Sequence, residues 1–265
     1  MKTVRVLVCS YPGIFADTVI KALQEYQAIE IVGLVYSERI FSAHESWIGG
    51  AIRMLKTSGI NYAVMQFMQT DLYLLLKYLR FCVSLDRQIP VITTKDINSP
   101  MGLSFIKSLN ADVLLLANFN QKVSSAVISS PTIACLNIHP STLPNFKGVD
   151  PVFAALYAGE KKLGVTVHLV DDNFDTGDII DQAMIPTDEN RSVFNHQVHL
   201  FQHGGKLAAN VIKTLPQSIE KLTKNIGGNY DSWPTKAKIK SFKKRGKSLI
   251  KPIEYISALK SLFIH

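Results

Sequence analysis

Apolar positions in the first half of the chain form short continuous runs, and longer segments with helical periodicity separate them. Continuous apolar runs are typical of strands that are covered on both faces. Their alternation with helical segments predicts βαβ units. We therefore expect an α/β fold, a mostly parallel sheet with helices on both faces. The expected strands are residues 4–9, 29–36, 90–93, 112–117 and 133–138.

The pattern changes after residue 150. Residues 163–170 alternate between apolar and polar positions, and a second strand-like segment, 178–185, follows them across a turn that contains Thr176 and Gly177. This pair predicts an antiparallel hairpin or an edge element of the sheet. Residues 192–215 return to helical periodicity.

A long insertion, residues 46–88, separates the second and third expected strands. Its segment 60–82 is rich in Met, Tyr, Phe and Leu, but Asp71, Lys77 and Arg80 interrupt it, so it is not a membrane span. We expect helices that pack on the sheet or on a second subunit, which would make the protein a homo-oligomer through 46–88. A membrane-surface role is the alternative.

Composition is that of a globular protein, with 47% hydrophobic and 19% charged residues. The first apolar run is too short for a signal peptide, and no transmembrane segment is expected, so we predict a cytoplasmic protein. Cys9, Cys82 and Cys135 have neither the spacing of a disulfide pair nor that of metal ligands. We expect buried reduced thiols and no metal.

Positive charge is concentrated in the C-terminal part of the chain. The formal net charge is +8, and Lys236 to Lys251 contains eight basic residues and no acidic one. We therefore divide the chain into a main domain, 1–215, and a short basic C-terminal extension, 216–265. The basic run is interpreted as a solvated surface arm, or else as a grip on a phosphorylated substrate, a nucleic acid or an anionic membrane.

Candidate chemistry begins where the fifth expected strand ends. Asn137 and His139 point to the same face because side chains alternate along a strand. Pro140 and Pro144 then stiffen the exit loop. An amide and an imidazole would thus lie side by side at the carboxyl end of a strand, where open α/β sheets place their ligands.

A second polar block follows the strand 163–170. Residues 171–178 offer several carboxylates in a tight turn, and one of them, Asp175, can approach His139. Such a turn could also be ordinary surface-loop chemistry, with Asp and Gly serving the turn geometry. Both blocks in one chain are much less expected by chance than either alone.

Together these motifs resemble the folate-dependent formyltransferase family. The resemblance rests on Asn-Ile-His-Pro-Ser-Thr-Leu-Pro at 137–144, Gly148, Gly-Val-Thr-Val-His at 164–168 and Asp-Thr-Gly-Asp at 175–178. The family includes glycinamide ribonucleotide, methionyl-tRNA and sugar N-formyltransferases. The resemblance implies a Rossmann-like catalytic domain over 1–215, with Asn137, His139 and Asp175 as the catalytic set.

The implied reaction moves a formyl group from 10-formyltetrahydrofolate, a co-substrate, to a primary amine, without a metal. Asn137 and a protonated His139 would stabilise the negative oxygen of the tetrahedral intermediate, and Asp175 would raise the pKa of His139. By the same resemblance the folate contacts are Asn118, Phe119, Gln121, Val123, Val170, Asp171 and Phe174. The acceptor-side residues are Ser10, Tyr11, Gly13, Lys147 and Gly148.

Four functions compete on this basis. The first is transfer to a small amine acceptor, with a nucleotide-linked amino sugar as first choice. The second is formylation of initiator methionyl-tRNA, a nucleic-acid partner that the basic extension favours. Hydrolysis of 10-formyltetrahydrofolate is third. A non-catalytic folate-binding module is the fourth, and the complete set of Asn137, His139 and Asp175 argues against it.

Overall fold

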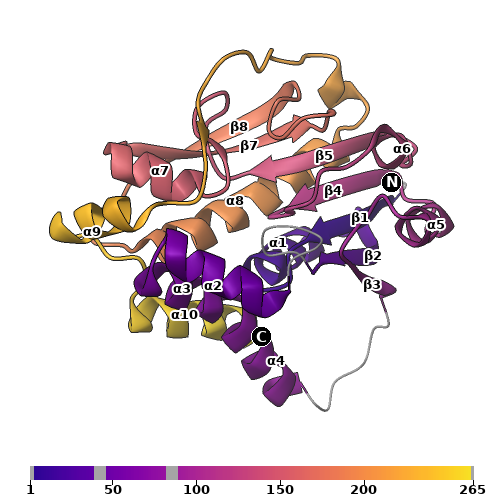
Figure 1. Cartoon of the computed structure of the whole chain (residues 1–265). Helices are drawn as coiled ribbons and strands as arrows, with labels where there is room; N and C mark the ends of the chain where they lie inside the picture. The colour runs from indigo at the N-terminus through magenta and orange to yellow at the C-terminus, as the bar shows by residue number, and fades with distance from the viewer. Residues whose placement is uncertain (1–2, 39–45, 82–88, 264–265) are drawn as a thin grey trace.

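The computed structural model describes residues 3–38, 46–81 and 89–263. Seven strands form one sheet in the order β3-β2-β1-β4-β5-β7-β8 (Figure 1). The first five strands in this order are mutually parallel. Strand β7 runs antiparallel to β5, and β8 runs antiparallel to β7. The expected α/β fold with a mostly parallel sheet is confirmed. The strands are β1 (Val4–Ser10), β2 (Ile29–Ser37), β3 (Val91–Thr94), β4 (Val113–Ala117), β5 (Ala134–His139), β7 (Lys162–Leu169) and β8 (Ile179–Pro186).

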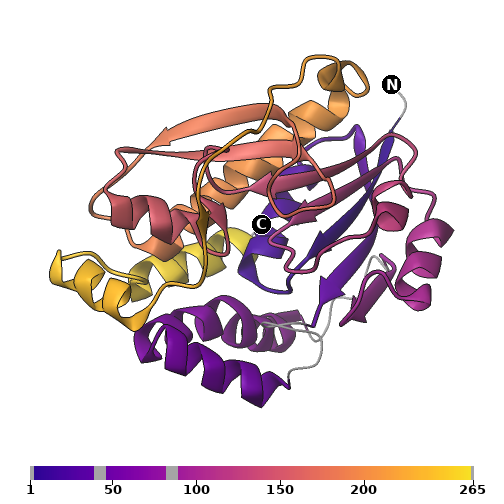
Figure 2. The ribbon, with the colours of Figure 1, turned by 45° about the horizontal axis from the view of Figure 1, so that its top comes forward.

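Helices cover both faces of the sheet and create two separate cores (Figures 1 and 2). The larger core lies under α1 and α8, and the smaller one lies under α5 and α6. Gly204 lets α8 lie directly against the strand that carries the expected chemistry, because a Cβ there would meet the Ile138 side chain at 2.5 Å. The helices of this central part are α1 (Ile14–Gln24), α5 (Pro100–Ser108), α6 (Ser125–Ile128), α7 (Pro151–Ala158) and α8 (Val193–Lys213).

The insertion is helical, as expected, and joins the larger core. Tyr62, Met65 and Tyr73 are fully buried in that core, while the opposite side of the insertion exposes many apolar side chains. Cys82 lies outside the described residues. None of the described helices has the length and hydropathy of a membrane span. The predicted self-association through 46–88 stays a prediction. The insertion consists of α2 (Trp47–Thr57), α3 (Ile60–Phe67), the π-helical turn η1 (Met68–Leu72) and α4 (Tyr73–Phe81).

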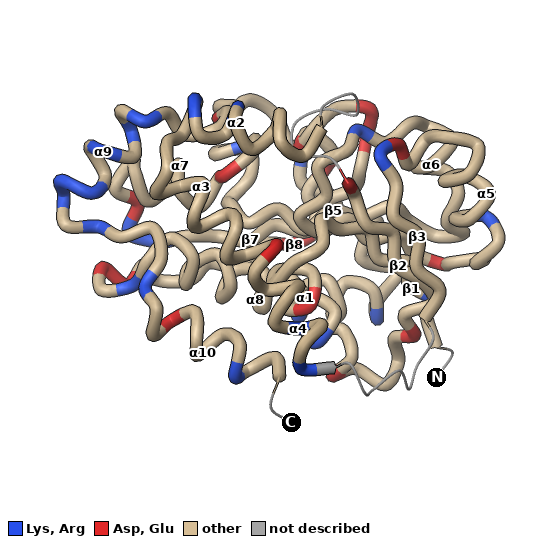
Figure 3. Tube along the Cα trace, turned by 60° about the horizontal axis from the view of Figure 1, so that its bottom comes forward, with Lys and Arg blue, Asp and Glu red and all other residues tan. Residues whose placement is uncertain are grey.

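The basic extension folds back over the main domain. Ile239, Phe242 and Tyr255 are buried in the larger core, and the Phe242 ring lies 5.1 Å from that of Phe153 on α7. The apolar side of the basic helix is therefore part of the protein interior, while its lysines are exposed. Figure 3 shows the basic residues of α9 gathered at one end of the molecule. The extension consists of the 3-10 turn η2 (Gln217–Ile219), β9 (Tyr230–Asp231), α9 (Lys236–Lys244) and α10 (Pro252–Phe263).

Candidate active site

Asn137 and His139 occupy the carboxyl end of β5, as the sequence predicts. The strand is hydrogen-bonded on both sides, to β4 and to β7, so its backbone has little freedom. His139 is almost fully buried, with 4% of its surface exposed, and Asn137 is half-buried. Both side chains line one cavity at the edge of the sheet. The strand thus presents a fixed pair of polar groups to a cavity.

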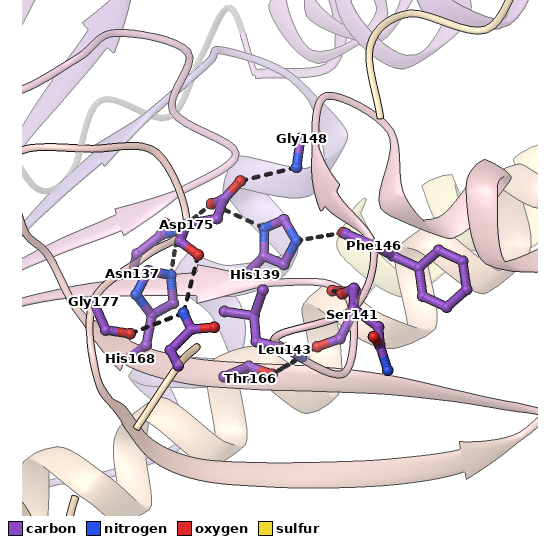
Figure 4. Close-up of polar contacts among 12 residues, drawn as sticks. Asn137, His139, Ser141, Leu143, Phe146, Gly148, Thr166, His168, Asp175 and Gly177 are labelled. Carbon is purple, nitrogen blue, oxygen red and sulfur yellow. Dashed lines mark hydrogen bonds and ion pairs between the residues drawn. The ribbon is translucent and has the colours of Figure 1, made fainter. Parts of the chain in front are cut away.

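His139 has a hydrogen-bond acceptor at each ring nitrogen (Figure 4). Its Nδ1 lies 3.2 Å from Oδ1 of Asp175, and its Nε2 lies 3.0 Å from the carbonyl oxygen of Phe146. Burial lowers the pKa of His139, but Asp175 and the Phe146 carbonyl outweigh burial and leave the pKa above its ordinary value. The ring is therefore predisposed to the doubly protonated, positively charged form.

Asp175 completes the cluster from a loop. Its backbone is left-handed, with φ of 56°, an unusual conformation for a residue other than glycine. Its Oδ2 accepts a hydrogen bond from the Gly148 N–H at 3.0 Å, while Oδ1 faces His139. Burial would raise the pKa of Asp175, yet the histidine charge and the Gly148 N–H lower it to about 2. The carboxylate stays ionised at neutral pH.

His168 is a member of the cluster that the sequence reasoning did not assign. It lies opposite Asn137 in the β5–β7 register, and its Nε2 is 3.0 Å from Nδ2 of Asn137. Its Nδ1 lies 2.7 Å from the Leu169 carbonyl oxygen and must therefore donate. Burial and the charge of His139 lower the pKa of His168 to about 4, so the ring is neutral and its Nε2 accepts. His168 thereby orients the amide of Asn137.

The sequence predicts only part of the position of His168. Alternation along 163–170 places it on one face of a strand, but the pairing partner of that strand cannot be read from the sequence. The contact between His168 and Asn137 depends on the register between β5 and β7, which lie far apart in the sequence.

The extension also enters the site, although the sequence predicted a catalytic apparatus complete by about residue 215. Asn225 is buried and donates two hydrogen bonds from Nδ2, each of 3.0 Å, to the carbonyl oxygens of Asp175 and Gly177. The strand β9 pairs with β6 (Lys147–Gly148), the segment that holds the carboxylate of Asp175. Residues beyond 215 therefore fix the loop that carries Asp175.

Several predicted contact residues have structural partners instead of facing the cavity. Ser10 is buried and donates to the Ala117 carbonyl at 2.7 Å. The Lys147 ammonium donates to the Gly227 carbonyl at 2.9 Å. Gln121 is buried and accepts from the Ile97 N–H. Val123 belongs to the smaller core. These four residues hold the loops in place and do not line the cavity.

Other predicted residues do face the cavity. Those that line it are Tyr11, Gly13, Asn118, Phe119, Gly148 and Phe174. Val170 packs against the smaller core beneath the loop. Asp171 accepts hydrogen bonds from the Asn173 N–H and the Thr176 hydroxyl, and so shapes the turn that leads to Asp175. The cavity has a volume of about 600 Å³, within the usual range for small-molecule sites.

Comparison with known proteins agrees with this geometry. A family model described as "Formyl transferase" matches residues 86–212, which include the whole reactive cluster except Asn225. A methionyl-tRNA formyltransferase of Syntrophus aciditrophicus (strain SB) is 34% identical over 113 residues, which cover 42% of this chain and 36% of that protein. The chain thus matches about a third of the length of this relative.

Solved structures show the same fold. A sugar 3N-formyl transferase, WlaRD, solved in the presence of dTDP and 5-N-formyl-THF, superposes with a TM-score of 0.54 at 19% identity, covering 100% of this chain and 81% of that one. The phosphoribosylglycinamide formyltransferase of Streptococcus pneumoniae TIGR4 superposes with a TM-score of 0.53 at 19% identity, covering 81% and 99%. The chain thus shares its fold with these formyltransferases, and residues 86–212, which carry Asn137, His139 and Asp175, match the formyl transferase family model.

Proposed function

We propose that this protein transfers a formyl group from 10-formyltetrahydrofolate to the primary amine of a small acceptor. The observation that carries the proposal is the buried ion pair of His139 and Asp175, 3.2 Å long, beside the amide of Asn137. The match of residues 86–212 to the formyl transferase family model and the 5-N-formyl-THF present with the sugar 3N-formyl transferase support the choice of donor.

The proposed reaction makes one bond and breaks one. The neutral amine nitrogen bonds to the formyl carbon, and the formyl oxygen takes the negative charge of a tetrahedral intermediate. The bond from the formyl carbon to N10 of the folate then breaks, and N10 takes the proton that the amine loses. The products are a formamide and tetrahydrofolate. The charge on oxygen is what the site has to stabilise.

Asn137 is the proposed hydrogen-bond donor to that oxygen. One N–H of its Nδ2 is directed to His168, 3.0 Å away, while the other has only a long contact of 3.5 Å with Oδ1 of Asp175. A long contact of this kind contributes little and is easily exchanged for a developing oxyanion. The hydrogen bond to His168 therefore fixes the orientation of the Asn137 amide and leaves its second N–H available for the oxyanion.

His139 and Asp175 have different proposed roles. Both N–H groups of the His139 ring already have acceptors, so its contribution in this arrangement is the positive charge of the imidazolium near the oxyanion. Asp175, with a pKa of about 2, is a weak base and is better suited to holding a water molecule that relays the amine proton. The ion pair favours the charged form of both groups.

The donor is proposed to lie across two loops that border the smaller core. Asn118 has a left-handed backbone, with φ of 53°, and its carbonyl accepts from the Tyr11 N–H, so the main chain turns sharply there. Phe119 lines the cavity on this side, and Phe174 faces it from the loop before Asp175. Main-chain groups and aromatic rings suit a flat heterocycle such as a pterin.

The acceptor is proposed to be a small amine, and a nucleotide-linked amino sugar is one candidate that the dTDP of the sugar 3N-formyl transferase supports. Methionyl-tRNA is the second candidate, because the sequence relative at 34% identity is a methionyl-tRNA formyltransferase. The two acceptors share a primary amine and differ in everything attached to it.

Calorimetry with 5-formyltetrahydrofolate, a stable analogue of the donor, tests the proposal. We expect saturable binding that weakens by about 10-fold in Phe119→Ala, equivalent to about 1.4 kcal/mol. Ile226→Ala is the matched control, since Ile226 is 77% exposed and outside the cavity lining. Absence of heat at millimolar ligand would overturn the assignment of the donor.

A further inference from the structure

The helical insertion forms an apolar wall of the cavity that contains the reactive cluster. Trp47, Met54, Leu55, Ile60, Val64 and Phe67 all line it. Trp47 is 58% exposed and Phe67 is 47% exposed, although both belong to helices that are otherwise packed on the protein. Apolar side chains that remain exposed while lining a cavity are typical of a binding surface.

The wall and the proposed donor loops pack into different cores. The insertion packs into the larger core through Tyr62 and Met65, whereas the proposed donor loops pack into the smaller core through Phe119 and Val170. These cores lie on opposite faces of the sheet, whose helices are seen on both sides in Figures 1 and 2. The cluster lies at the carboxyl end of β5. If the folate approaches from one face, the wall faces the molecule that approaches from the other.

Buried hydrogen bonds hold this wall rigidly against the catalytic domain. The Tyr62 hydroxyl donates to Oδ2 of Asp150 at 2.6 Å, and the Gln69 side chain donates to Gln197 at 2.8 Å. Gln197 in turn donates to Oδ1 of Asp150 at 3.1 Å. Asp150 is also the N-cap of α7, where it accepts from the Phe153 N–H. The wall is therefore a preformed part of the site.

The charges in the cavity are unsuited to a phosphorylated acceptor. Among the described residues that line it, none is Lys or Arg, the acidic residues are Asp71, Asp150 and Asp175, and the one group predisposed to a positive charge, His139, is already paired with Asp175. The first turn, which contains the predicted acceptor-side residue Gly13, is covered: a Cβ on Gly13 would lie 2.6 Å from the Gln69 carbonyl oxygen. That oxygen therefore lies beside the N-terminus of α1, where a bound phosphate would need free N–H groups. The lysines of α9 are not among the residues that line the cavity.

We propose that the acceptor is a primary amine carried on an apolar body, such as an alkyl chain, that lies against α2 and α3 without a phosphate group. The inference rests on the proposed formyl transfer and specifies its acceptor. The Asp71 carboxylate, which lies outside the His139–Asp175 pair, favours the arriving ammonium ion, and burial of the apolar body supplies affinity in proportion to its area. This acceptor class replaces the nucleotide-linked amino sugar as the preferred one.

A series of alkylamines tests the inference, with binding measured by calorimetry in the absence of folate. Butylamine, hexylamine and octylamine carry the same ammonium group, so their differences report the apolar body alone. We expect affinity to rise by about 4-fold for each buried methylene group. A dTDP-linked amino sugar should bind more weakly than octylamine. Affinity that is independent of chain length, or tighter binding of the dTDP sugar, would overturn the inference.

Substitutions locate the binding surface. Phe67→Lys and Val64→Lys should each weaken octylamine binding by at least about 10-fold while leaving 5-formyltetrahydrofolate binding unchanged. Leu79→Lys is the matched control, because Leu79 is 64% exposed on the same insertion but outside the cavity lining. Equal losses in all three variants would show that the wall is not the binding surface. Failure of folate binding in the parent protein would count against the proposed function separately, since the amine measurements do not depend on it.

Discussion

The two sides of the reactive cluster are held in different ways. Asn137 and His139 stand on an interior strand with hydrogen-bonded neighbours on both sides. Asp175 stands on a loop in a left-handed conformation and depends on Asn225, fifty residues further along the chain, for two hydrogen bonds to that loop. A strand positions its side chains through the whole sheet, whereas a strained loop keeps its geometry only while its braces remain. Asp175 is thus the member of the cluster whose position can be changed from a distance.

Asn137→Ala should produce the largest effect, because it removes the proposed oxyanion donor without disturbing the strand that carries it. We expect kcat to fall by about 10²–10³-fold while the dissociation constant of 5-formyltetrahydrofolate stays nearly unchanged, and loss of the hydrogen bond to the buried His168 lowers stability by about 1–3 kcal/mol. Steady-state kinetics with octylamine, together with thermal melts, check this. A variant that keeps more than a tenth of the parent kcat would remove Asn137 from the mechanism.

Asp175→Asn should lower kcat by about 10²-fold and move the pH dependence. Without the carboxylate, burial dominates and the pKa of His139 falls below its ordinary value, so the charged form is lost at a lower pH. NMR titration of the His139 ring in the parent and the variant measures this shift. An unchanged His139 titration would contradict the ion pair as the cause.

The same pair makes folding stability depend on pH in a defined way. The pKa of Asp175 is depressed to about 2, so its contribution is present above its unfolded value near pH 4 and is lost as the pH falls toward 2. The pKa of His139 is raised, so its contribution is complete below about pH 6.5 and is lost as the pH rises through the raised value. The pair is therefore most stabilising between about pH 4 and 6.5.

Asn225→Ala should have a smaller effect, which acts through the loop. It leaves the carbonyl oxygens of Asp175 and Gly177 without their donor, which costs about 1–3 kcal/mol of stability, and the displaced carboxylate should lower kcat by about 10-fold. The His139 pKa should move toward that of Asp175→Asn, a change that a merely structural residue would not cause. Ile226→Ala is the control. Loss of stability with unchanged kcat and His139 pKa would show that the brace does not position Asp175.

Local pattern was sufficient to predict much of the molecule. The runs at 4–9 and 112–117 became β1 and β4, and the alternation at 163–170 and 178–185 became the antiparallel pair β7 and β8. The motif around Asn137 and His139 placed both side chains on one face of a strand end, and the structure brings Asp175 to 3.2 Å from His139. Periodicity and short motifs are local properties, so a sequence displays them directly.

Contacts between distant segments were not predictable in this way. The sequence indicated a helical insertion and a basic extension, but it contained no sign that Phe67 would face the reactive cluster or that Asn225 would reach Asp175. The same limit applied to the pairing of His168 with Asn137, which depends on the register between two strands. These contacts arise because burial of the larger core folds the insertion and the extension over the sheet, and burial is set by the whole chain. Short motifs in the sequence therefore identify the reactive groups. The walls of the cavity around them depend on how the insertion and the extension pack on the sheet.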